Sequence, residues 1–294
     1  AQSMIGGYYW SGYYWGGEFV EPDDDEAIKW FRASAEQGHP WGLYELGRCY
    51  ELGRGVAANE EEAFRYYKES FESEEDSPAL TSLVRCYSEG VGVEKNTEKA
   101  IEILRKAAEA ENSEAQYELG NWLRTGTGVD KNAEEAFEWM TRAADAEHEE
   151  AQDALTEMYS DGEGTDLDLE EAVRWHRRLA KSGNAFHQFM LADSYWNGWG
   201  AEENNEKAAK WYRAAAEQEM PFAFVGLGTC YELGFGVDQD NEEAFLNYQK
   251  GYEIGIDDRA VSALARCYRS GSGVEQNIEE AKKLYLEAAE SGDS

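Results

Sequence analysis

A short glycine motif, G-x-G, returns along this chain at intervals of 36 or 37 residues. It reads ELGRGV at residues 51–56 and ELGFGV at residues 232–237, and further copies lie at residues 88–93, 124–129, 160–165, 196–201 and 269–274. A fixed period of this length is typical of stacked repeats, in which each unit buries its apolar face against its neighbours. The chain should therefore be an array of similar units rather than a mixture of unrelated elements.

Each unit also carries a signal for the start of a helix. The position four residues before a recurring alanine holds Asn or Asp in all eight units: Asp23, Asn59, Asn96, Asn132, Asp168, Asn204, Asp240 and Asn277. These side chains accept hydrogen bonds from the first free backbone N–H groups of a helix. Glu stands three residues later in six of the eight units, an arrangement close to a capping box. We expect the second helix of every unit to begin at these caps.

The segment before each glycine motif has the pattern of a first helix. In AQYELGNWLRTG, residues 115–126, apolar side chains recur four residues apart and share one helix face. Glycine then suits the helix end, because it enters the left-handed conformation without a steric cost. The result is an all-α solenoid of eight helix-turn-helix repeats that fills residues 1–294 as one domain, with units starting near residues 6, 42, 79, 115, 151, 187, 223 and 260.

The aromatic stretch MIGGYYWSGYYWGG at residues 4–17 looks at first like low-complexity sequence. Its Gly6, Trp10, Tyr14 and Gly17 lie 36 residues before the matching positions of the second unit. We therefore expect it to be the first helix of the first repeat, with Trp10 in the place of a core leucine. Glycine in a helix interior costs roughly 1 kcal/mol, so the packing of this helix must compensate.

The motifs together resemble the Sel1-like repeat family, a relative of the tetratricopeptide repeats. The resemblance is clear in LYELGRCYELGRGVAANEEEAFRYY (residues 43–67) and in LADSYWNGWGAEENNEKAAKWYRAAAEQ (residues 191–218). It implies a right-handed superhelix and a protein-binding adaptor without catalysis of its own, and some bacterial members are immunity proteins. One departure concerns the last glycine of the family pattern, which is kept at Gly38, Gly183, Gly255 and Gly292 but replaced at Glu74, Glu111, Glu147 and Glu219.

The net charge of the chain limits the classes of partner that it can bind. It holds 27 Lys and Arg against 61 Asp and Glu, a net charge of −34. Such a surface repels nucleic acid and anionic membranes, and no stretch approaches the ~20 apolar residues of a membrane span. The acidic surface favours a basic protein partner or serves solubility alone, and both interpretations stay open.

No pattern of residues points to catalysis, a cofactor or a metal. The histidines His39, His148, His176 and His187 are scattered and form no zinc motif. The cysteines Cys49, Cys86, Cys230 and Cys267 all take one repeat position. Equivalent positions of packed helices lie about 8–10 Å apart, whereas a disulfide needs Cα atoms within about 7 Å. We expect four unpaired core thiols and no enzyme activity, and a cytoplasmic location is favoured.

The face of each first helix opposite its core stripe is the candidate surface for a partner. In tetratricopeptide-like solenoids this face lines the concave groove. It carries aromatic and arginine side chains, the types enriched in binding hot spots: Tyr8, Trp15, Trp41, Tyr44, Arg48, Arg85, Tyr117, Arg124, Phe186, Phe189, Trp196, Phe222, Arg259, Arg266 and Arg269. In the fifth repeat the same face is acidic, with Glu150, Asp153, Glu157 and Asp161. An alternative stays open: the aromatics pack between repeats and the arginines balance nearby acids.

Two classes of function follow. The first is a non-enzymatic adaptor or scaffold that grips a partner segment in its groove, and a narrower form of it is a bacterial immunity or inhibitor protein. The second is a structural protein that assembles end to end through its aromatic N-terminal helix and exposed C-terminal helix. The sequence does not identify the partner or the oligomeric state.

Overall fold

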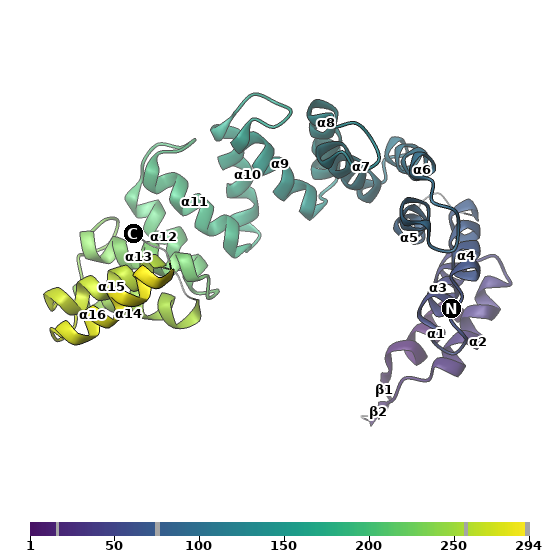
Figure 1. Cartoon of the computed structure of the whole chain (residues 1–294), viewed down its shortest axis with the longest axis horizontal. Coiled ribbons are helices and arrows are strands. Elements are labelled where there is room, and N and C mark those ends of the chain that lie inside the picture. The colour runs from purple at the N-terminus through teal and green to yellow at the C-terminus, as the bar shows by residue number, and fades with distance from the viewer. Residues whose placement is uncertain (16–17, 74–76, 256–257, 292–294) are drawn as a thin grey trace. The chain divides into compact units, whose positions relative to one another are not determined.

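The computed structural model describes residues 1–15, 18–73, 77–255 and 258–291 of the chain (Figure 1). Helices make up nearly all of it: α1 (Gln2–Ser11), α2 (Asp24–Ala35), α3 (Pro40–Leu52), α4 (Glu60–Ser73), α5 (Leu80–Arg85) with the π-helical turn η1 (Cys86–Gly90), α6 (Thr97–Glu109), α7 (Ser113–Thr125), α8 (Ala133–Asp145), α9 (Glu149–Asp161), α10 (Leu169–Lys181), α11 (Ala185–Asn197), α12 (Asn205–Ala216), α13 (Pro221–Leu233), α14 (Asn241–Ile254), α15 (Asp258–Ser270) and α16 (Ile278–Ser291). The prediction of an all-α solenoid of helix-turn-helix repeats is confirmed.

The chain forms two compact units. The N-terminal unit comprises Ala1–Leu155 and Glu163–Thr165, and the C-terminal unit comprises Thr156–Gly162 and Asp166–Ser294. In the N-terminal unit, α1 packs on α2, α3 on α4 and α7 on α8; in the C-terminal unit, α11 packs on α12, α13 on α14 and α15 on α16. Within each unit, the second helix of one pair also contacts the first helix of the next, as α2 contacts α3 and α12 contacts α13. This stacking continues the hydrophobic core from one repeat to the next.

The predicted helix caps are present in all eight repeats. The side chains of Asp23, Asn59, Asn96, Asn132, Asp168, Asn204, Asp240 and Asn277 each accept a hydrogen bond from the backbone N–H three residues later. Each bond satisfies one of the donors that a helix start leaves without a partner. These caps fix where every second helix begins, and so they set the period of the array.

The two glycines of each turn have different structural roles. The first ends the helix in the left-handed conformation, as Gly53 does with φ 67°. The second lies against the preceding repeat, because a Cβ on Gly236 would stand 2.0 Å from the carbonyl oxygen of Asn205. A Cβ on Gly92 would meet the carbonyl oxygen of Glu60 at the same distance. The motif therefore recurs because repeats stack at this point.

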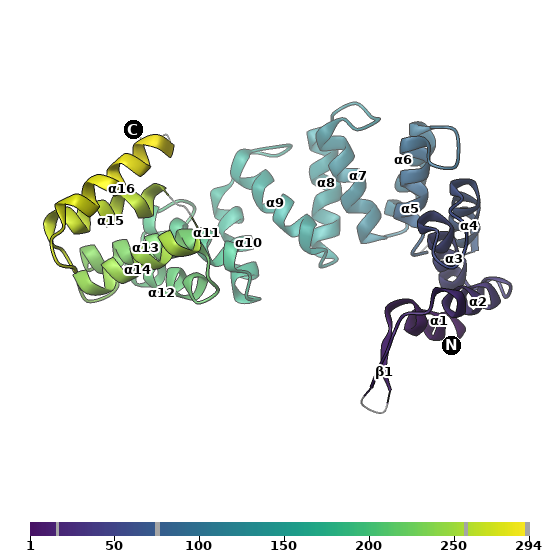
Figure 2. The same cartoon turned by 60° about the horizontal axis from the view of Figure 1, so that its bottom comes forward.

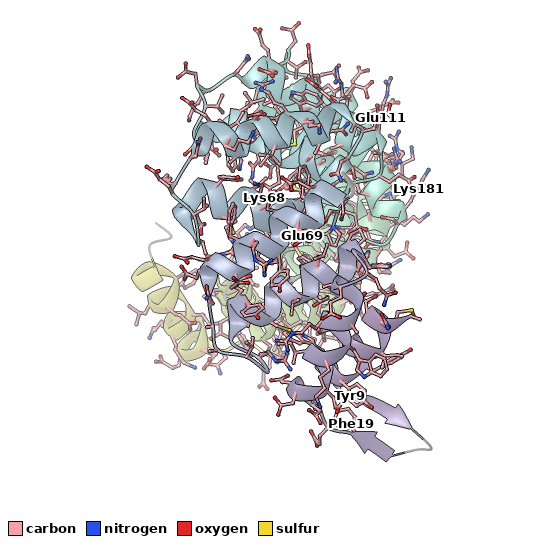
Figure 3. The ribbon with its side chains drawn as sticks, turned by 90° about the vertical axis from the view of Figure 1, so that its right-hand side faces the viewer. Tyr9, Phe19, Lys68, Glu69, Glu111 and Lys181 are labelled. Atoms are coloured by element: carbon pink, nitrogen blue, oxygen red, sulfur yellow. The ribbon has the colours of Figure 1, made fainter. Side chains whose placement is uncertain are left out.

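The prediction of a helix over residues 6–17 is wrong over residues 12–15, and residues 16–17 lie outside the described residues. Helix α1 ends at Ser11, and a β-hairpin follows, with β1 (Tyr13–Trp15) antiparallel to β2 (Glu18–Val20) and Tyr14 opposite Phe19. Tyrosine and tryptophan favour strands, and residues 13–15 are Tyr-Tyr-Trp. Figure 2 shows the hairpin extending away from α1, and Figure 3 labels Tyr9 of α1 and Phe19 of β2 near its base.

Trp10 packs α1 against the first two repeats of the N-terminal unit. Its ring is half-buried and meets the ring of Phe31 edge-on, with centroids 5.9 Å apart. The guanidinium of Arg54 lies 3.7 Å from the centroid of the Trp10 indole, and that of Arg48 lies 5.3 Å from it. Arg54 also donates to the carbonyl oxygen of Trp10 and to Asp24. The aromatic helix is therefore tied to the second repeat by cation–π contacts as well as by packing.

Three turns contain glutamate in the left-handed conformation. Glu111, Glu147 and Glu219 have φ angles of 66°, 65° and 61°, as Gly38 has with 70°. The position thus keeps its backbone geometry where the glycine of the family pattern is lost; Glu74 and Gly292 lie outside the described residues. Glu111 is labelled at the surface in Figure 3. A side chain in this conformation costs roughly 1–2 kcal/mol.

The four cysteines are buried and unpaired. Burial raises the pKa of the Cys49 and Cys230 thiols to about 12, and those of Cys86 and Cys267 to about 11. They therefore pack as small apolar groups and stay protonated at neutral pH. Across the described part of the chain, none of the helices combines the length and the apolar character that a membrane crossing requires.

Candidate functional site

A groove with a volume of about 510 Å³ opens in the C-terminal unit. Its walls come from α11, α13 and α15, and α12 and α14 each add a tyrosine. The lining residues are Phe189, Asp193, Trp196, Asn197, Trp199, Tyr212, Phe222, Val225, Gly226, Thr229, Tyr248, Arg259, Ser262, Ala263 and Arg266. We call it the α11–α15 groove. Five residues predicted to bind a partner line it: Phe189, Trp196, Phe222, Arg259 and Arg266.

The aromatic lining forms one connected wall. Phe189 is buried, and its ring centroid lies 6.0 Å from that of Phe222 and 6.1 Å from that of Tyr212. Trp196 packs against Tyr212 at 6.4 Å. Phe222 and Trp199 stay exposed, at 42% and 58%. The wall therefore combines fixed inner rings with outer rings that are open to a partner.

The bottom of the groove is polar. The Tyr212 hydroxyl donates to Oδ1 of the half-buried Asp193. The Tyr248 hydroxyl donates to Glu232 at 2.6 Å and lies 3.3 Å from Oγ1 of Thr229. Burial raises the pKa of both tyrosines, and the nearby carboxylates raise it further. Both phenols therefore remain protonated donors at neutral pH.

Two arginines of α15 stand at the outer edge of the groove. The Arg259 guanidinium lies 5.2 Å from the ring centroid of Phe222. Arg266 is exposed and forms an ion pair with Glu232 at 3.3 Å. Since an arginine carries five N–H donors, Arg266 can donate further hydrogen bonds besides its contact with Glu232.

The carboxyl group of Asp193 is in an unfavourable setting for a charge. Burial raises its pKa above the ordinary value, although the Tyr212 hydroxyl and the charge of Arg259 act in the opposite direction. Among the residues that the structure describes, Tyr212 is the one hydrogen-bond donor to this side chain. The carboxylate would therefore gain from a further donor or a positive charge.

Sequence reasoning missed several residues of the groove. Asp193, Val225, Thr229 and Ser262 lie on the same helix-face positions as the predicted residues, and the position rule alone could have found them. Tyr212 and Tyr248 come from the second helices of their repeats, and Trp199 comes from a turn. A rule limited to the first helix of each repeat has no signal for these three.

Two predicted residues of the C-terminal unit lie outside this lining. Phe186 is 49% exposed at the start of α11 and packs edge-on against His187 at 5.3 Å. Arg269 lies near the end of α15, with its guanidinium 5.9 Å from the ring centroid of Tyr285. Neither reaches the polar floor of the groove.

The predicted arginines of the N-terminal unit are all paired with carboxylates. Arg48 contacts Glu45 at 3.2 Å, Arg85 forms an ion pair with Glu51, and two nitrogens of Arg124 reach Oε2 of Glu163 at 2.8 and 3.0 Å. These are the internal charge pairs that the alternative interpretation of the sequence describes. Their side chains are still about one quarter to one third exposed.

The predicted aromatics of the N-terminal unit divide into exposed and packed groups. Tyr8 and Trp41 are exposed at 53% and 52%. Tyr44 packs against Tyr67 with ring centroids 5.9 Å apart, and Tyr117 stacks on the ring of His148 at 4.7 Å. The side chain of Trp15 lies outside the described part of the structure. The acids of the fifth repeat, Glu150, Asp153, Glu157 and Asp161, are all exposed on α9.

Other hollows have less to offer a ligand. One of about 810 Å³ covers the cap and turn residues 204–206 and 236–238, whose polar groups serve the helix starts. In the N-terminal unit, one of about 170 Å³ adjoins Arg85 and Trp122, and one of about 410 Å³ adjoins Met4 and Trp41. The α11–α15 groove is distinguished from these by its combination of aromatic walls, a polar floor and arginines.

Comparison with known proteins gives consistent matches. The Sel1 repeat pattern matches residues 1–39, 42–73, 79–112, 113–148, 150–184, 188–220, 224–255 and 259–293. The crystal structure of a protective antigen of uropathogenic Escherichia coli with an SLR fold is 30% identical and has a TM-score of 0.85, covering 99% of this chain and 61% of its own. A Sel1 repeat protein from Oxalobacter formigenes is 25% identical with a TM-score of 0.70, covering 100% of this chain and 83% of its own.

A curated relative matches over a shorter stretch. It is the exopolysaccharide production negative regulator of Rhizobium meliloti (strain 1021), 44% identical over 45 residues. The match spans 15% of this chain and 17% of that protein. The chain thus corresponds to less than two thirds of the length of both the Rhizobium protein and the Escherichia coli antigen.

Proposed function

The chain belongs to the Sel1 repeat family, whose repeats generally mediate protein–protein interaction, and we propose that it is a non-enzymatic adaptor that binds a segment of a partner protein in the α11–α15 groove. The observation that carries this proposal is the convergence of Phe189, Trp196, Phe222, Arg259 and Arg266 on one groove. A few hot-spot residues carry most of the binding energy of an interface, and Trp, Tyr and Arg are enriched among them.

The depth and chemistry of the groove suit a segment of polypeptide. Its volume of about 510 Å³ accommodates one or two large side chains. The exposed rings of Phe222 and Trp199 offer apolar contact, and the donors of Arg266 can bind main-chain carbonyl groups. A bound segment would thus bury apolar surface and fill hydrogen bonds at the same time.

The net charge of −34 supports a narrower form of the proposal. An acidic surface speeds the association with a basic partner, as a bacterial immunity or inhibitor protein needs when it neutralises a basic toxin. In this form, the rate of association falls steeply as salt is added.

Partner capture tests the groove. The wild-type chain and a Trp196→Ser/Phe222→Ser variant are used as baits in lysate of the source, and the captured proteins are compared by mass spectrometry. Trp41→Ser is the matched control, because Trp41 holds the position of Phe222 in the second repeat and is similarly exposed. We expect the groove variant to lose a partner that the wild type and the control retain.

A model in which the outer helix faces bind the partner makes a different forecast. Glu61 and Glu242 take equivalent exposed positions on α4 and α14. If reversing these charges abolishes capture while the groove variant captures normally, the groove proposal is wrong.

Exposed apolar side chains at both ends of the chain favour a second candidate, end-to-end assembly. Met4 and Tyr8 of α1 are exposed at 66% and 53%, and Ile278 and Leu286 of α16 at 45% and 64%. Exposed apolar side chains that gather into a patch mark interaction sites. Light scattering over a wide concentration range distinguishes the two functions: a mass that grows with concentration, and that Met4→Asp/Leu286→Asp restores to 33.2 kDa, supports assembly.

A further inference from the structure

The repeat array allows one position to be compared between the two units. Helices α3 and α13 lie 181 residues apart and read PWGLYELGRCYEL and PFAFVGLGTCYEL. In both units a tyrosine and an arginine of neighbouring helices bond to the glutamate near the end of this helix. In the N-terminal unit the Tyr67 hydroxyl and Arg85 both bond to Glu51; in the C-terminal unit Tyr248 and Arg266, at the equivalent positions, both bond to Glu232.

Inside the N-terminal cluster, the chain supplies its own cation. The Arg48 guanidinium lies 5.3 Å from the ring centroid of Trp10 and 5.8 Å from that of Tyr44. It also forms an ion pair with Glu45 at 3.2 Å. An arginine is thus held here by two aromatic rings and one carboxylate, which are the groups that bind a guanidinium best.

The C-terminal unit lacks that arginine but keeps the kinds of group that would hold one. Thr229 stands at the position of Arg48, and Gly226 stands at the position of Glu45. These two residues are smaller than Arg48 and Glu45, and they line the α11–α15 groove. Its lining still provides aromatic faces, from Trp196 and Phe222, and a carboxylate, from Asp193.

The charges of the groove leave room for one more cation. Arg266 is offset by its ion pair with Glu232. Arg259 lies over Phe222 and attracts Asp193, but burial outweighs that attraction, because the pKa of Asp193 is raised rather than lowered. The carboxylate therefore lacks full compensation. Since the whole chain carries a net charge of −34, its field also draws cations inward.

We propose that the α11–α15 groove receives an arginine side chain of the partner, with its guanidinium between the rings of Trp196 and Phe222 and against the carboxylate of Asp193. The partner's arginine takes the role that Arg48 plays inside the N-terminal unit. Arg259 and Arg266, at the outer edge, bind main-chain carbonyl groups on either side of it. This inference rests on the proposed function and names the chemistry of the partner.

The test uses a single blocked arginine as the probe and measures its binding to the groove. Two-dimensional NMR follows the indole N–H signals of Trp196 and Trp199, assigned through Trp→Phe variants, while N-acetyl-arginine amide is added. N-acetyl-citrulline amide is the control ligand, because it has nearly the same shape without the charge. We expect saturable shifts of these two signals with the arginine amide and at least tenfold weaker binding of the citrulline amide.

Matched variants locate the probe. Thr229→Arg places the chain's own guanidinium in the groove and should abolish the shifts, whereas Arg48→Thr at the equivalent position should leave them intact. Asp193→Asn keeps an acceptor for Tyr212 and should weaken binding at least tenfold, so it provides a second reading if Thr229→Arg fails to fold. Equal binding of citrulline amide, or undiminished shifts with both groove variants, overturns the proposal.

The outcome separates this inference from the proposed function. If the arginine probe does not bind but Trp196→Ser/Phe222→Ser still loses the captured partner, the groove binds a protein by another chemistry and the arginine proposal is wrong. N-acetyl-glutamate amide and N-acetyl-phenylalanine amide then identify that chemistry, and tighter binding of either than of the arginine amide also overturns it.

Discussion

Helix α3 of the N-terminal unit and helix α13 of the C-terminal unit share one design and differ in what fills it. At three equivalent positions, Tyr44, Glu45 and Arg48 become Val225, Gly226 and Thr229, respectively. The larger side chains pack on each other around Trp10 and Tyr67, whereas the smaller ones border a groove of about 510 Å³. The comparison indicates how a repeat protein can form a groove: a few side chains are shorter, while the helices pack in the same order.

Gly226 also shapes the floor of that groove. A Cβ at this position would stand 2.5 Å from the ring of Tyr212. The absence of a side chain lets the Tyr212 ring approach α13 closely, which places its hydroxyl beside Asp193. This glycine therefore makes room for the Tyr212 ring, which brings a polar group to the groove.

The largest effect should come from the aromatic side chain that closes the N-terminal region. Trp10→Ala removes the contacts with Phe31, Arg48 and Arg54, and we expect it to lower the free energy of unfolding by about 3 kcal/mol, at the low end for tryptophan truncation because Trp10 is half-buried. Trp199→Ala, at the open groove, should cost less than about 0.5 kcal/mol. Urea denaturation of both variants measures the difference, and similar costs would contradict the contrast between a closed and an open region.

The next effect concerns pH and compares buried positions of neighbouring repeats. The rings of His176 and His187 meet in the C-terminal unit with their Nδ1 atoms 2.9 Å apart, where the preceding repeat has Met140 and Ala151. Burial, with a contribution from His187, lowers the pKa of His176 to about 4 from an ordinary 6.5. Below pH 6.5 the unfolded chain therefore takes up a proton that the folded chain does not, and stability falls as the pH drops towards 4.

Between pH 7 and pH 5 this difference amounts to about 2 kcal/mol. The variant His176→Met/His187→Ala restores the residues of the preceding repeat and should lose that part of the pH dependence. Unfolding in urea at both pH values, for wild type and variant, measures it. Identical pH profiles would show that the histidine pair has no such role.

A smaller effect tests whether the two Tyr–Glu–Arg clusters are equivalent. Tyr67→Phe and Tyr248→Phe each remove one hydrogen bond to a carboxylate, from Glu51 and Glu232. Each should cost about 1–2 kcal/mol, as hydrogen bonds to charged groups do. Thermal unfolding of the two variants measures both losses of stability. If they differ by more than about 1 kcal/mol, the two clusters are not equivalent, and the hydrogen bond of Tyr248 beside the open groove differs in strength from that of Tyr67.

The sequence predicts the array well because local signals coincide there. An Asn or Asp cap, a glycine pair and an apolar stripe all indicate the same helix boundaries in every repeat, and the eight caps form as expected. The first repeat is the exception. The spacing of Tyr14 and Gly17 matches the other units, yet the hairpin forms, because the strand preference of the Tyr-Tyr-Trp run outweighs the helical spacing there.

The groove is harder to predict than the array. Of the residues predicted from one face of each first helix, Phe189, Trp196 and Phe222 lie on its lining. Asp193 and Thr229 lie on the same face but were not among the predicted residues. A rule that selects this face cannot distinguish the open position of Thr229 from the filled position of Arg48. That distinction depends on the combined volume of the side chains at positions 225, 226 and 229. It also depends on the tyrosines of the second helices, and the repeat spacing of the first helices carries no information about them.

The smallest effect exchanges one turn residue between the compared regions. Gly38 before α3 and Glu219 before α13 take equivalent positions, both in the left-handed conformation, with φ angles of 70° and 61°. A side chain costs roughly 1–2 kcal/mol in this conformation, and the greater freedom of glycine in the unfolded chain offsets about 0.4–1 kcal/mol of that. Glu219→Gly should therefore stabilise the protein by about 0.5–1 kcal/mol and Gly38→Glu should destabilise it by a similar amount. Glu219→Gln, which removes the charge but keeps the strained backbone, should change little, and thermal unfolding of the three variants would refute the strain argument if Gln and Gly stabilised equally.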